Sequence, residues 1–222
     1  MCGDENLYHG SEENRIRGVR MLIEAGASVN IENDWQPLAV AAASGNLQLV
    51  QMLLEAGADV RETCAMGYTA LHSSVGADAY YDWFKGPEGA RHIRSAFDCA
   101  AALLGAGADA NAPTHRGTTP LLLVARVVPS HLSTRLYAVL LRGGAILNRD
   151  ETQAEAETRS PYFDKVHVAR SPYLDKVHDA GGWKRYEQAH RKQLVSLFAP
   201  KLRLPTDVIP LVVDFWANVG MY

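Results

Sequence analysis

Leucines recur with helical spacing at four places along the chain, and each run ends in a similar phrase. The phrases are LIEAGASVN (22–30), LLEAGADVR (53–61), LLGAGADAN (103–111) and LLRGGAILN (140–148). The apolar residues of each run fall on one stripe of a helix, as Val50, Leu53 and Leu54 do in the second run. The glycine that follows can take the left-handed conformation that ends a helix. We therefore expect an amphipathic helix and a turn at each place.

A second phrase precedes three of these helices. It reads WQPLAVAA (35–42), YTALHSSV (68–75) and TTPLLLVA (118–125). Thr119 can cap a helix whose first position is Pro120, where the missing N–H needs no partner. The alanines at 41–43 are small and let neighbouring helices approach closely. The chain thus alternates two short helices, and several pairs must stack because one pair cannot bury its apolar face alone.

The spacing of the phrases is regular. Ala70 follows Gly57 by 13 residues, Pro120 follows Gly107 by the same interval, and Pro37 precedes Gly57 by 20. The two intervals add up to the 33-residue period of ankyrin repeats.

The chain resembles the ankyrin-repeat family over roughly residues 4–198. TALH at 69–72 and TTPLLLVA at 118–125 are similar to that family's Thr-Pro-Leu-His motif, and the Gly-Ala-Asp turns are similar to its turns. The resemblance implies an all-α ankyrin-repeat solenoid of helix-turn-helix units, with short β-turn or hairpin fingers and a C-terminal capping helix. It also implies that the array binds another protein through its concave face and finger tips.

The positions of the repeated phrases divide the chain into five units and a tail. The expected bounds are 1–30 for a degenerate first repeat, 31–61 for the second, 62–111 for the third, 112–148 for the fourth, 149–199 for a degenerate fifth, and 200–222 for a C-terminal cap. The third repeat holds an insertion at 77–94, between its two helices.

An eleven-residue stretch is duplicated within the fifth unit, over 159–180. RSPYFDKVHVA (159–169) is followed by RSPYLDKVHDA (170–180), and either Ser-Pro pair can open an inner helix. Pro172 excludes one helix across both copies. The spacing from Gly144 favours the first copy and the spacing to Gly181 favours the second. We favour the second, because a tight helix-turn-helix couples its helices more strongly than a loop of variable length. A doubled recognition peptide is the alternative interpretation.

The composition is that of a soluble globular protein, since 47% of the 222 residues are hydrophobic and 21% are charged. The net charge of −3 gives no general attraction to nucleic acid or to a membrane surface. The apolar runs are shorter than the ~20 residues that cross a bilayer, and the acidic first thirty residues are unlike a signal peptide. Three scattered cysteines fit no disulfide framework. We expect a monomer in the cytoplasm or nucleus.

The sequence holds no motif that predicts catalysis or a cofactor. None of the eight histidines forms an HxxxH or HExxH pair, and phosphate-binding loops, dinucleotide-binding loops and GxSxG elbows are absent. His72 lies in the TALH motif, where the family resemblance implies a structural role. We therefore predict that the protein is not an enzyme and has no catalytic, cofactor or metal site.

One stretch near the C-terminus is strongly basic. Between residues 183 and 203 lie six lysines and arginines but only one acid, Glu187. A solvated outer helix face is the expected interpretation, and an anionic partner is the alternative.

The insertion at 77–94 is the expected main binding element. Tyr80, Tyr81, Trp83 and Phe84 place four aromatic rings within five residues, and large aromatic residues are enriched at interface hot spots. Alternatively these rings fold back and cover the apolar edge of the solenoid, because exposed aromatic patches are costly. Further candidates at the finger tips are Asp34, Trp35, Met66, Tyr68, His115 and Arg116.

The tail after residue 199 is apolar on most sides, so we expect it to be covered. Pro200 is expected to end the preceding helix. A cap over the last repeat is the favoured interpretation, since the open ends of a solenoid need protection. Alternatively, LPTDVI at 204–209 resembles the opening of an F-box, which some poxvirus ankyrin proteins use to recruit a ubiquitin ligase. The end of the chain is also similar to the tails of brown-algal ankyrin proteins.

The sequence therefore supports two functions. The expected one is a non-catalytic protein-protein interaction module, which binds its partner through the concave surface and the aromatic insertion. The alternative is a substrate-recruiting adaptor of a ubiquitin ligase, which acts through the F-box-like tail.

Overall fold

The computed structural model describes residues 12–31, 36–76, 87–127, 130–146, 172–202, 208–209 and 212. Its helices are α1 (Glu12–Glu24), α2 (Pro37–Ala43), α3 (Leu47–Glu55), α4 (Ala70–Gly76), α5 (Pro87–Gly105), α6 (Pro120–Val127), α7 (Ser130–Arg142), α9 (Pro172–Asp179) and α10 (Trp183–Leu202). Within the described residues the β pairing is limited to an isolated bridge between Thr63 and Thr69.

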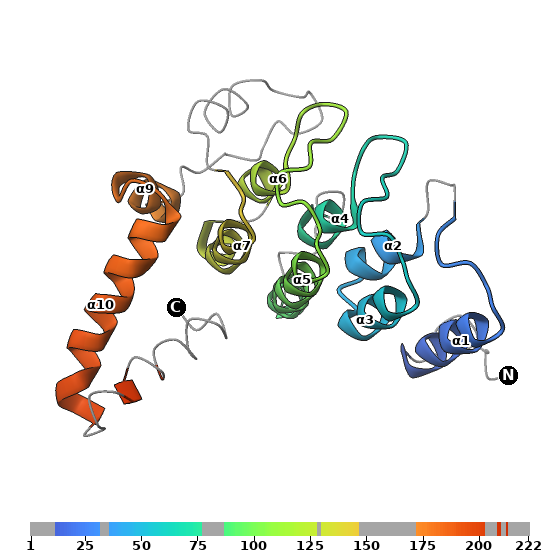
Figure 1. Cartoon of the computed structure of the whole chain (residues 1–222), viewed down its shortest axis with the longest axis horizontal. Coiled ribbons are helices and arrows are strands. Elements are labelled where there is room, and N and C mark those ends of the chain that lie inside the picture. The colour runs from blue at the N-terminus through green and yellow to red at the C-terminus, as the bar shows by residue number, and fades with distance from the viewer. Residues whose placement is uncertain are drawn as a thin grey trace, which may run out of the picture.

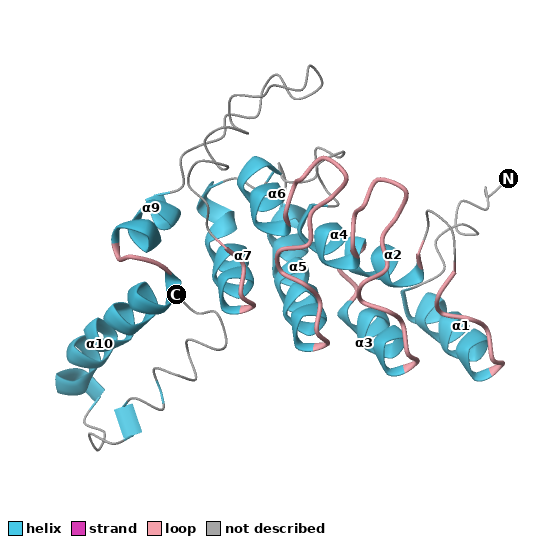
Figure 2. Cartoon of the chain, turned by 45° about the horizontal axis from the view of Figure 1, so that its top comes forward, coloured by secondary structure: helices cyan, strands magenta, loops and turns pink. Residues whose placement is uncertain are grey.

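The helices lie in two layers of one elongated stack (Figure 1). The short helices α2, α4, α6 and α9 follow one another in the inner layer, and α3, α5 and α7 follow one another in the outer layer. The loops after α3 and α5 rise beside the inner layer as two parallel fingers (Figure 2). Neighbouring units pack through like helices, α2 with α4 and α4 with α6, and α3 with α5 and α5 with α7. The predicted all-α solenoid is confirmed.

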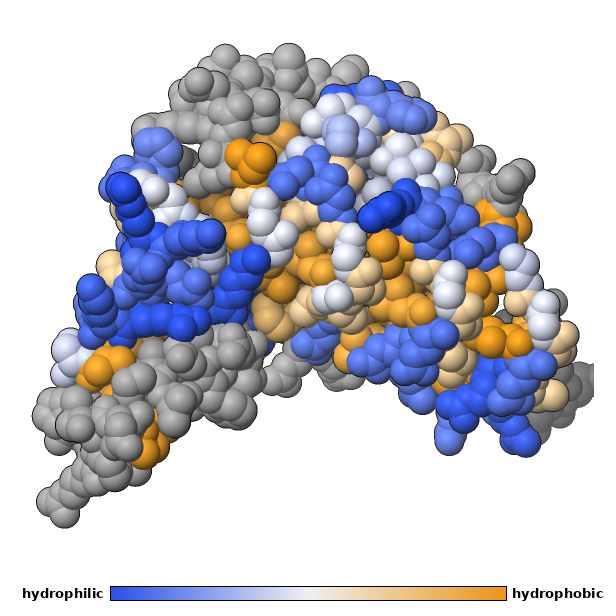
Figure 3. Space-filling model, viewed as in Figure 1, coloured by the Kyte–Doolittle hydropathy of each residue, from blue (hydrophilic) through white to orange (hydrophobic). Residues whose placement is uncertain are grey.

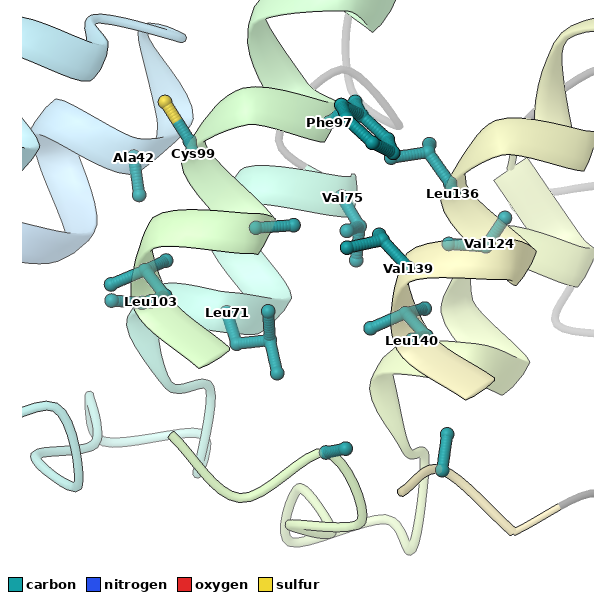
Figure 4. Close-up of a cluster of buried hydrophobic side chains, with 14 of the residues drawn as sticks. Ala42, Leu71, Val75, Phe97, Cys99, Leu103, Val124, Leu136, Val139 and Leu140 are labelled. Carbon is teal, nitrogen blue, oxygen red and sulfur yellow. The ribbon is translucent and has the colours of Figure 1, made fainter. Parts of the chain in front are cut away.

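One continuous apolar core lies between the layers (Figure 4). Leu71, Leu103 and Leu140 come from three different helices and are fully buried in it. Ala42 of α2 is also buried in it. Cys99 lies in the same core, and burial together with the nearby Asp98 raises the pKa of its thiol to about 12. This thiol is therefore a neutral packing group.

The repeated glycine phrases end their helices in the same way. The four glycines have φ between 82° and 95°, the left-handed conformation that a side chain would oppose. After α3, for example, the Ala58 N–H donates to the Leu53 carbonyl at 2.9 Å and the Gly57 N–H donates to the Leu54 carbonyl at 3.1 Å. At the other end of a helix pair, the Leu122 N–H donates to Thr119 Oγ1 at 3.4 Å, so Thr119 caps α6 as predicted.

Helix α5 is longer than the sequence phrases indicate. It begins at Pro87 and has 19 residues, whereas α3 has 9. Residues 87–94 of the insertion therefore belong to the outer helix. Pro87 is the first residue of this helix, a position that suits proline because its missing N–H needs no partner there.

The second copy of the duplicated stretch forms α9, the inner helix of the fifth unit. Val177 of this helix is fully buried, and Gly181 begins the turn to α10 with a φ of 76°. The first copy, 159–169, lies outside the described residues.

The prediction that Pro200 ends its helix was wrong, because α10 runs to Leu202. Residue 200 lies two positions before the end of α10, so few intrahelical hydrogen bonds follow the one that the missing N–H of proline removes. Beyond α10, Ile209 of the tail is only 1% exposed.

Two asparagines clamp neighbouring turns together. Asn30 donates from Nδ2 to the Gly57 carbonyl at 3.1 Å and accepts from the Asp59 N–H at 2.9 Å. Asn111 does the same two joints later, with the Gly144 carbonyl at 2.9 Å and the Ile146 N–H at 2.8 Å. The sequence patterns did not predict these clamps.

The joint between the second and third units has no such clamp. Arg61 stands four residues after Gly57, as Asn111 stands four residues after Gly107. A guanidinium donates hydrogen bonds but accepts none, so it cannot serve a carbonyl and an N–H together. The equivalent backbone groups of this joint belong to Gly107 and Asp109, which are exposed.

His72 joins the third unit to the fourth. Its ring is fully buried, and its Nδ1 accepts from the Thr69 N–H at 3.2 Å. Its Nε2 lies 3.1 Å from the Thr118 carbonyl, which can only accept, so Nε2 carries the proton. Burial lowers the pKa of His72, and the bond to Thr118 opposes this in part. The predicted structural role of His72 agrees with this geometry.

We predict that Arg61→Asn stabilises the protein by about 0.5–1.5 kcal/mol, the usual net contribution of a hydrogen-bonded pair. The new side chain can reach the Gly107 carbonyl and the Asp109 N–H as Asn111 reaches its own partners. Urea unfolding followed by circular dichroism measures the change. Arg61→Ala is the matched control, and equal stabilities of the two variants would show that no clamp forms.

We also predict that stability falls as the pH drops below about 6.5, the ordinary pKa of histidine. Burial lowers the pKa of His72 in the folded protein. As the pH falls, the unfolded chain therefore binds a proton at this residue before the folded protein does. The free energy of unfolding then falls by up to about 1.4 kcal/mol per pH unit, until the pH passes the lower, folded pKa. Urea unfolding at several pH values should show a weaker pH dependence for His72→Gln. Parallel profiles of the two proteins would contradict this role of His72.

Candidate protein-binding surface

The two described fingers are built from the same hydrogen bonds. In the finger at 63–69, the Cys64 N–H donates to the Tyr68 carbonyl at 3.0 Å and the Gly67 N–H donates to the Cys64 carbonyl at 2.8 Å. The finger at 114–118 has the same pattern: the Thr114 N–H donates to the Thr118 carbonyl at 3.0 Å, and the Gly117 N–H donates to the Thr114 carbonyl at 2.8 Å. Each finger is therefore a tight turn closed on itself.

The finger tips are fixed to one another. The His115 N–H donates to the Met66 carbonyl at 3.1 Å. A Cβ atom on Gly67 would come within 2.7 Å of the His115 nitrogen, so only glycine permits this approach. The base of the first finger is tied to the preceding unit by Gln36, whose Nε2 donates to the Thr63 carbonyl at 2.8 Å. The tips form a row of fixed spacing.

Four of the predicted binding residues lie on this row. Met66 is 58% exposed, and His115 and Arg116 are exposed beside it. Tyr68 is partly buried, because its ring packs edge-on against His72 with centroids 5.5 Å apart. The other candidates lie outside the described residues: Asp34, Trp35, Tyr80, Tyr81, Trp83 and Phe84.

Val40 adds an exposed apolar side chain that the sequence patterns did not single out. It lies on the inner helix α2 and is 47% exposed. Leu38, Ala41 and Ala42 form the buried stripe of this helix, so a valine between them falls off the stripe. The position of Val40 off this buried stripe is the sequence signal from which its exposure could have been predicted. Figure 3 shows apolar residues gathered over the central helices, whereas the surface of α9 and α10 is mostly hydrophilic.

The described part of the chain offers few reactive groups. Within it there is no group of three or more histidine, cysteine or acidic side chains that could hold a metal ion. His72 is buried with both ring nitrogens bonded, and Cys99 is a buried thiol of high pKa. No helix among the described residues is long and apolar enough to span a membrane.

These features define a helical-repeat solenoid that presents a preorganised row of finger tips. Residues 7–83 match the family model described as ankyrin repeats (3 copies). The chain is 42% identical over 110 residues to "Ankyrin repeat and SOCS box protein 16" of Homo sapiens, which is 48% of this chain and 22% of that protein. Residues 7–83 are therefore identified as ankyrin repeats, a type of unit that generally serves protein-protein interaction.

Other relatives share shorter stretches. The chain is 46% identical over 72 residues to "Palmitoyltransferase AKR1" of Kluyveromyces lactis, covering 31% of this chain and 10% of the relative. It is 37% identical over 75 residues to "BRCA1-associated RING domain protein 1" of Caenorhabditis elegans, which is 33% of this chain and 11% of the relative. The chain thus spans less than a quarter of each of these relatives. The ankyrin repeats are generally non-catalytic, including where a relative is named as an enzyme.

Proposed function

We propose that the protein is a non-catalytic interaction module that binds one partner protein along its inner helices and finger tips. The single observation that carries the proposal is the bond between His115 and the Met66 carbonyl. It holds an exposed methionine, histidine and arginine in one fixed row. A row that is already ordered loses little conformational entropy on binding, so more of the contact energy appears as affinity.

The aromatic insertion is proposed as the main contact of the same partner. The first finger ends where α4 begins, at Ala70, and the insertion starts where α4 ends, at Gly76. A helix of seven residues is about 10 Å long. In the sequence, residues 80–84 begin four positions after Gly76, so the same partner is proposed to contact both Met66 and the insertion. We expect the protein to act as a monomer in the cytoplasm or nucleus.

We predict that Trp83→Ala combined with Phe84→Ala weakens partner binding at least about 30-fold, the effect of a hot spot worth about 2 kcal/mol. The melting temperature should change little. The partner is first identified by cross-linking to the full chain, and its affinity for each variant is then measured by calorimetry. A matched control removes two exposed apolar side chains of α1, Met21→Ala with Leu22→Ala. If the aromatic variant instead loses stability, the rings cover the core.

A ubiquitin-ligase adaptor is the second candidate function. It rests on the F-box-like stretch at 204–209, and one relative's name likewise pairs ankyrin repeats with a further element, a SOCS box. The burial of Ile209 favours the cap, since a hook for a ligase must be accessible. We therefore place the adaptor role second.

We predict that truncation after Leu202 lowers the free energy of unfolding by about 1–3 kcal/mol, because it removes the buried Ile209 and exposes what that side chain covers. Urea unfolding compares the full and shortened chains, and a pulldown with a purified Skp1-type protein is performed on both. The adaptor role requires the opposite pair of results: a shortened chain of unchanged stability, and binding of the Skp1-type protein by the full chain alone.

A further inference from the structure

The helix pair of α9 and α10 is set further from its neighbours than the other helices of the array. Like helices of adjacent units pack closely along the stack, as α4 does on α6 and α5 does on α7. The backbones of α9 and α10 do not come as close to those of α6 and α7 (Figure 1 and Figure 2). The joint between the fourth and fifth units is therefore bridged by side chains that reach across it.

Aromatic rings and an ion pair bridge this joint. Tyr173 of α9 stacks on Tyr137 of α7, with ring centroids 6.1 Å apart and planes 8° apart. Arg142 of α7 donates from Nε to Oε1 of Glu187 on α10 at 3.2 Å, and its guanidinium lies 5.8 Å from the centre of the Trp183 ring. The two side chains of the ion pair are 22% and 20% exposed, so water partly screens their attraction.

Little apolar surface is buried in the fifth unit. Six consecutive residues of α7, at 136–141, are buried, whereas Val177 is the one buried residue between positions 172 and 197. Tyr173, Trp183 and Tyr186 are each only partly buried. Since burial of apolar surface is the main source of cohesion between repeat units, the last joint stabilises the stack less than the central joints do.

The two helices of the fifth unit hold each other more firmly. Tyr173 of α9 meets Tyr186 of α10 edge-on with centroids 5.6 Å apart, and Trp183 lies 5.9 Å from Tyr186. The turn between the helices is closed by a backbone bond, from the Gly182 N–H to the Val177 carbonyl at 3.0 Å. The pair is therefore a more cohesive body than the joint that attaches it to the array.

We propose that α9 and α10 form a hinged arm, which opens away from α7 as one body and closes again. Opening separates Tyr173 from Tyr137 and Glu187 from Arg142, while the contacts between α9 and α10 stay intact. Such a local opening requires less free energy than unfolding of the whole stack, because it breaks the contacts of one joint only. The central units are held on both sides and do not open in this way.

The hinged arm changes the shape of the inner side of the array. Helix α9 follows α2, α4 and α6 in the inner layer, so its position sets the curvature of that layer at its C-terminal end. A partner that fits the closed arm shifts the equilibrium towards it, by as much as the partner's affinities for the two positions differ. The opening itself needs no partner and does not rest on the proposed function.

Ala138 of α7 provides a reporter of the opening. It is 8% exposed and lines a space of about 30 Å³ together with Trp183 and Tyr186 of α10. A cavity of about 150 Å³ is needed to hold benzene, so an aromatic disulfide reagent cannot reach a thiol at this position while the arm is closed. The native Cys99 is fully buried in the central core and serves as the internal control.

The test labels the full chain that carries Ala138→Cys with this reagent, and mass spectrometry measures the rate at each cysteine. Each rate is divided by the rate in the urea-unfolded chain, which gives the fraction of time that the site is open. This fraction should be at least about tenfold larger at residue 138 than at Cys99, because Cys99 becomes accessible only when the stack itself opens.

A second substitution tests the ion pair. In the Ala138→Cys background, Glu187→Gln should raise the labelling rate at residue 138 about two- to fivefold and leave Cys99 unchanged. Glu24→Gln makes the same change of charge on an exposed residue of α1, so it is the matched control and should change neither rate. Because both variants carry the same cysteine, any loosening by the thiol itself cancels in the comparison.

Hydrogen exchange then separates opening of the arm from its unfolding. An arm that moves as one body keeps its helical hydrogen bonds, so the amides of α9 and α10 should be open for a smaller fraction of time than the thiol at residue 138. Equal fractions would overturn the proposal, as would labelling of residue 138 no faster than Cys99, or equal effects of Glu187→Gln and Glu24→Gln. All these rates are measured without a partner, so failure of the proposed function leaves the test unaffected.

Discussion

Burial of an apolar face that no single helix pair can cover alone is the constraint on which this structure depends. Leu71, Leu103 and Leu140 come from three different helices, yet all are fully buried in one cluster. Burying a leucine side chain contributes about 1.5–3 kcal/mol, and each unit obtains this only from its neighbours. The units must therefore stack in a row, and the surface that remains exposed is long and shallow. Such a shape suits contact with another protein better than enclosure of a small substrate.

Hydrophobic contact sets the order of the units, but polar contacts fix how one unit sits on the next. Each described joint uses a different set. Asn30 and Asn111 clamp turns, Gln36 reaches a finger base, and His72 bridges to the Thr118 carbonyl. Because apolar packing is not directional, these bonds hold the finger row at constant spacing. The last joint uses stacked rings and an ion pair: Tyr173 of α9 stacks on Tyr137 of α7, and Arg142 of α7 pairs with Glu187 of α10.

The sequence predicted the features that depend on neighbouring residues, such as helix caps, but not the hydrogen bonds between residues far apart in the chain. Glycines that end helices and Thr119 as a cap depend on neighbours within a few residues, so their phrases predicted them. Asn30 bonds backbone groups of two residues that lie 27 and 29 positions further along the chain, and no pattern within one unit predicts these bonds. The start of α5 at Pro87 was missed because the insertion carries no repeated phrase to set its phase. Most residues predicted for binding lie outside the described residues and remain predictions.

The proposed binding side of the array follows from the difference between the layers. The inner helices α2, α4 and α6 are short and largely buried, and Val40 of α2 is an exposed apolar side chain among them. Outer helices face solvent on one side and can carry charge there without disturbing the stack, as α10 does with Lys184 and Lys192. A partner on the inner side would therefore have to match its shape.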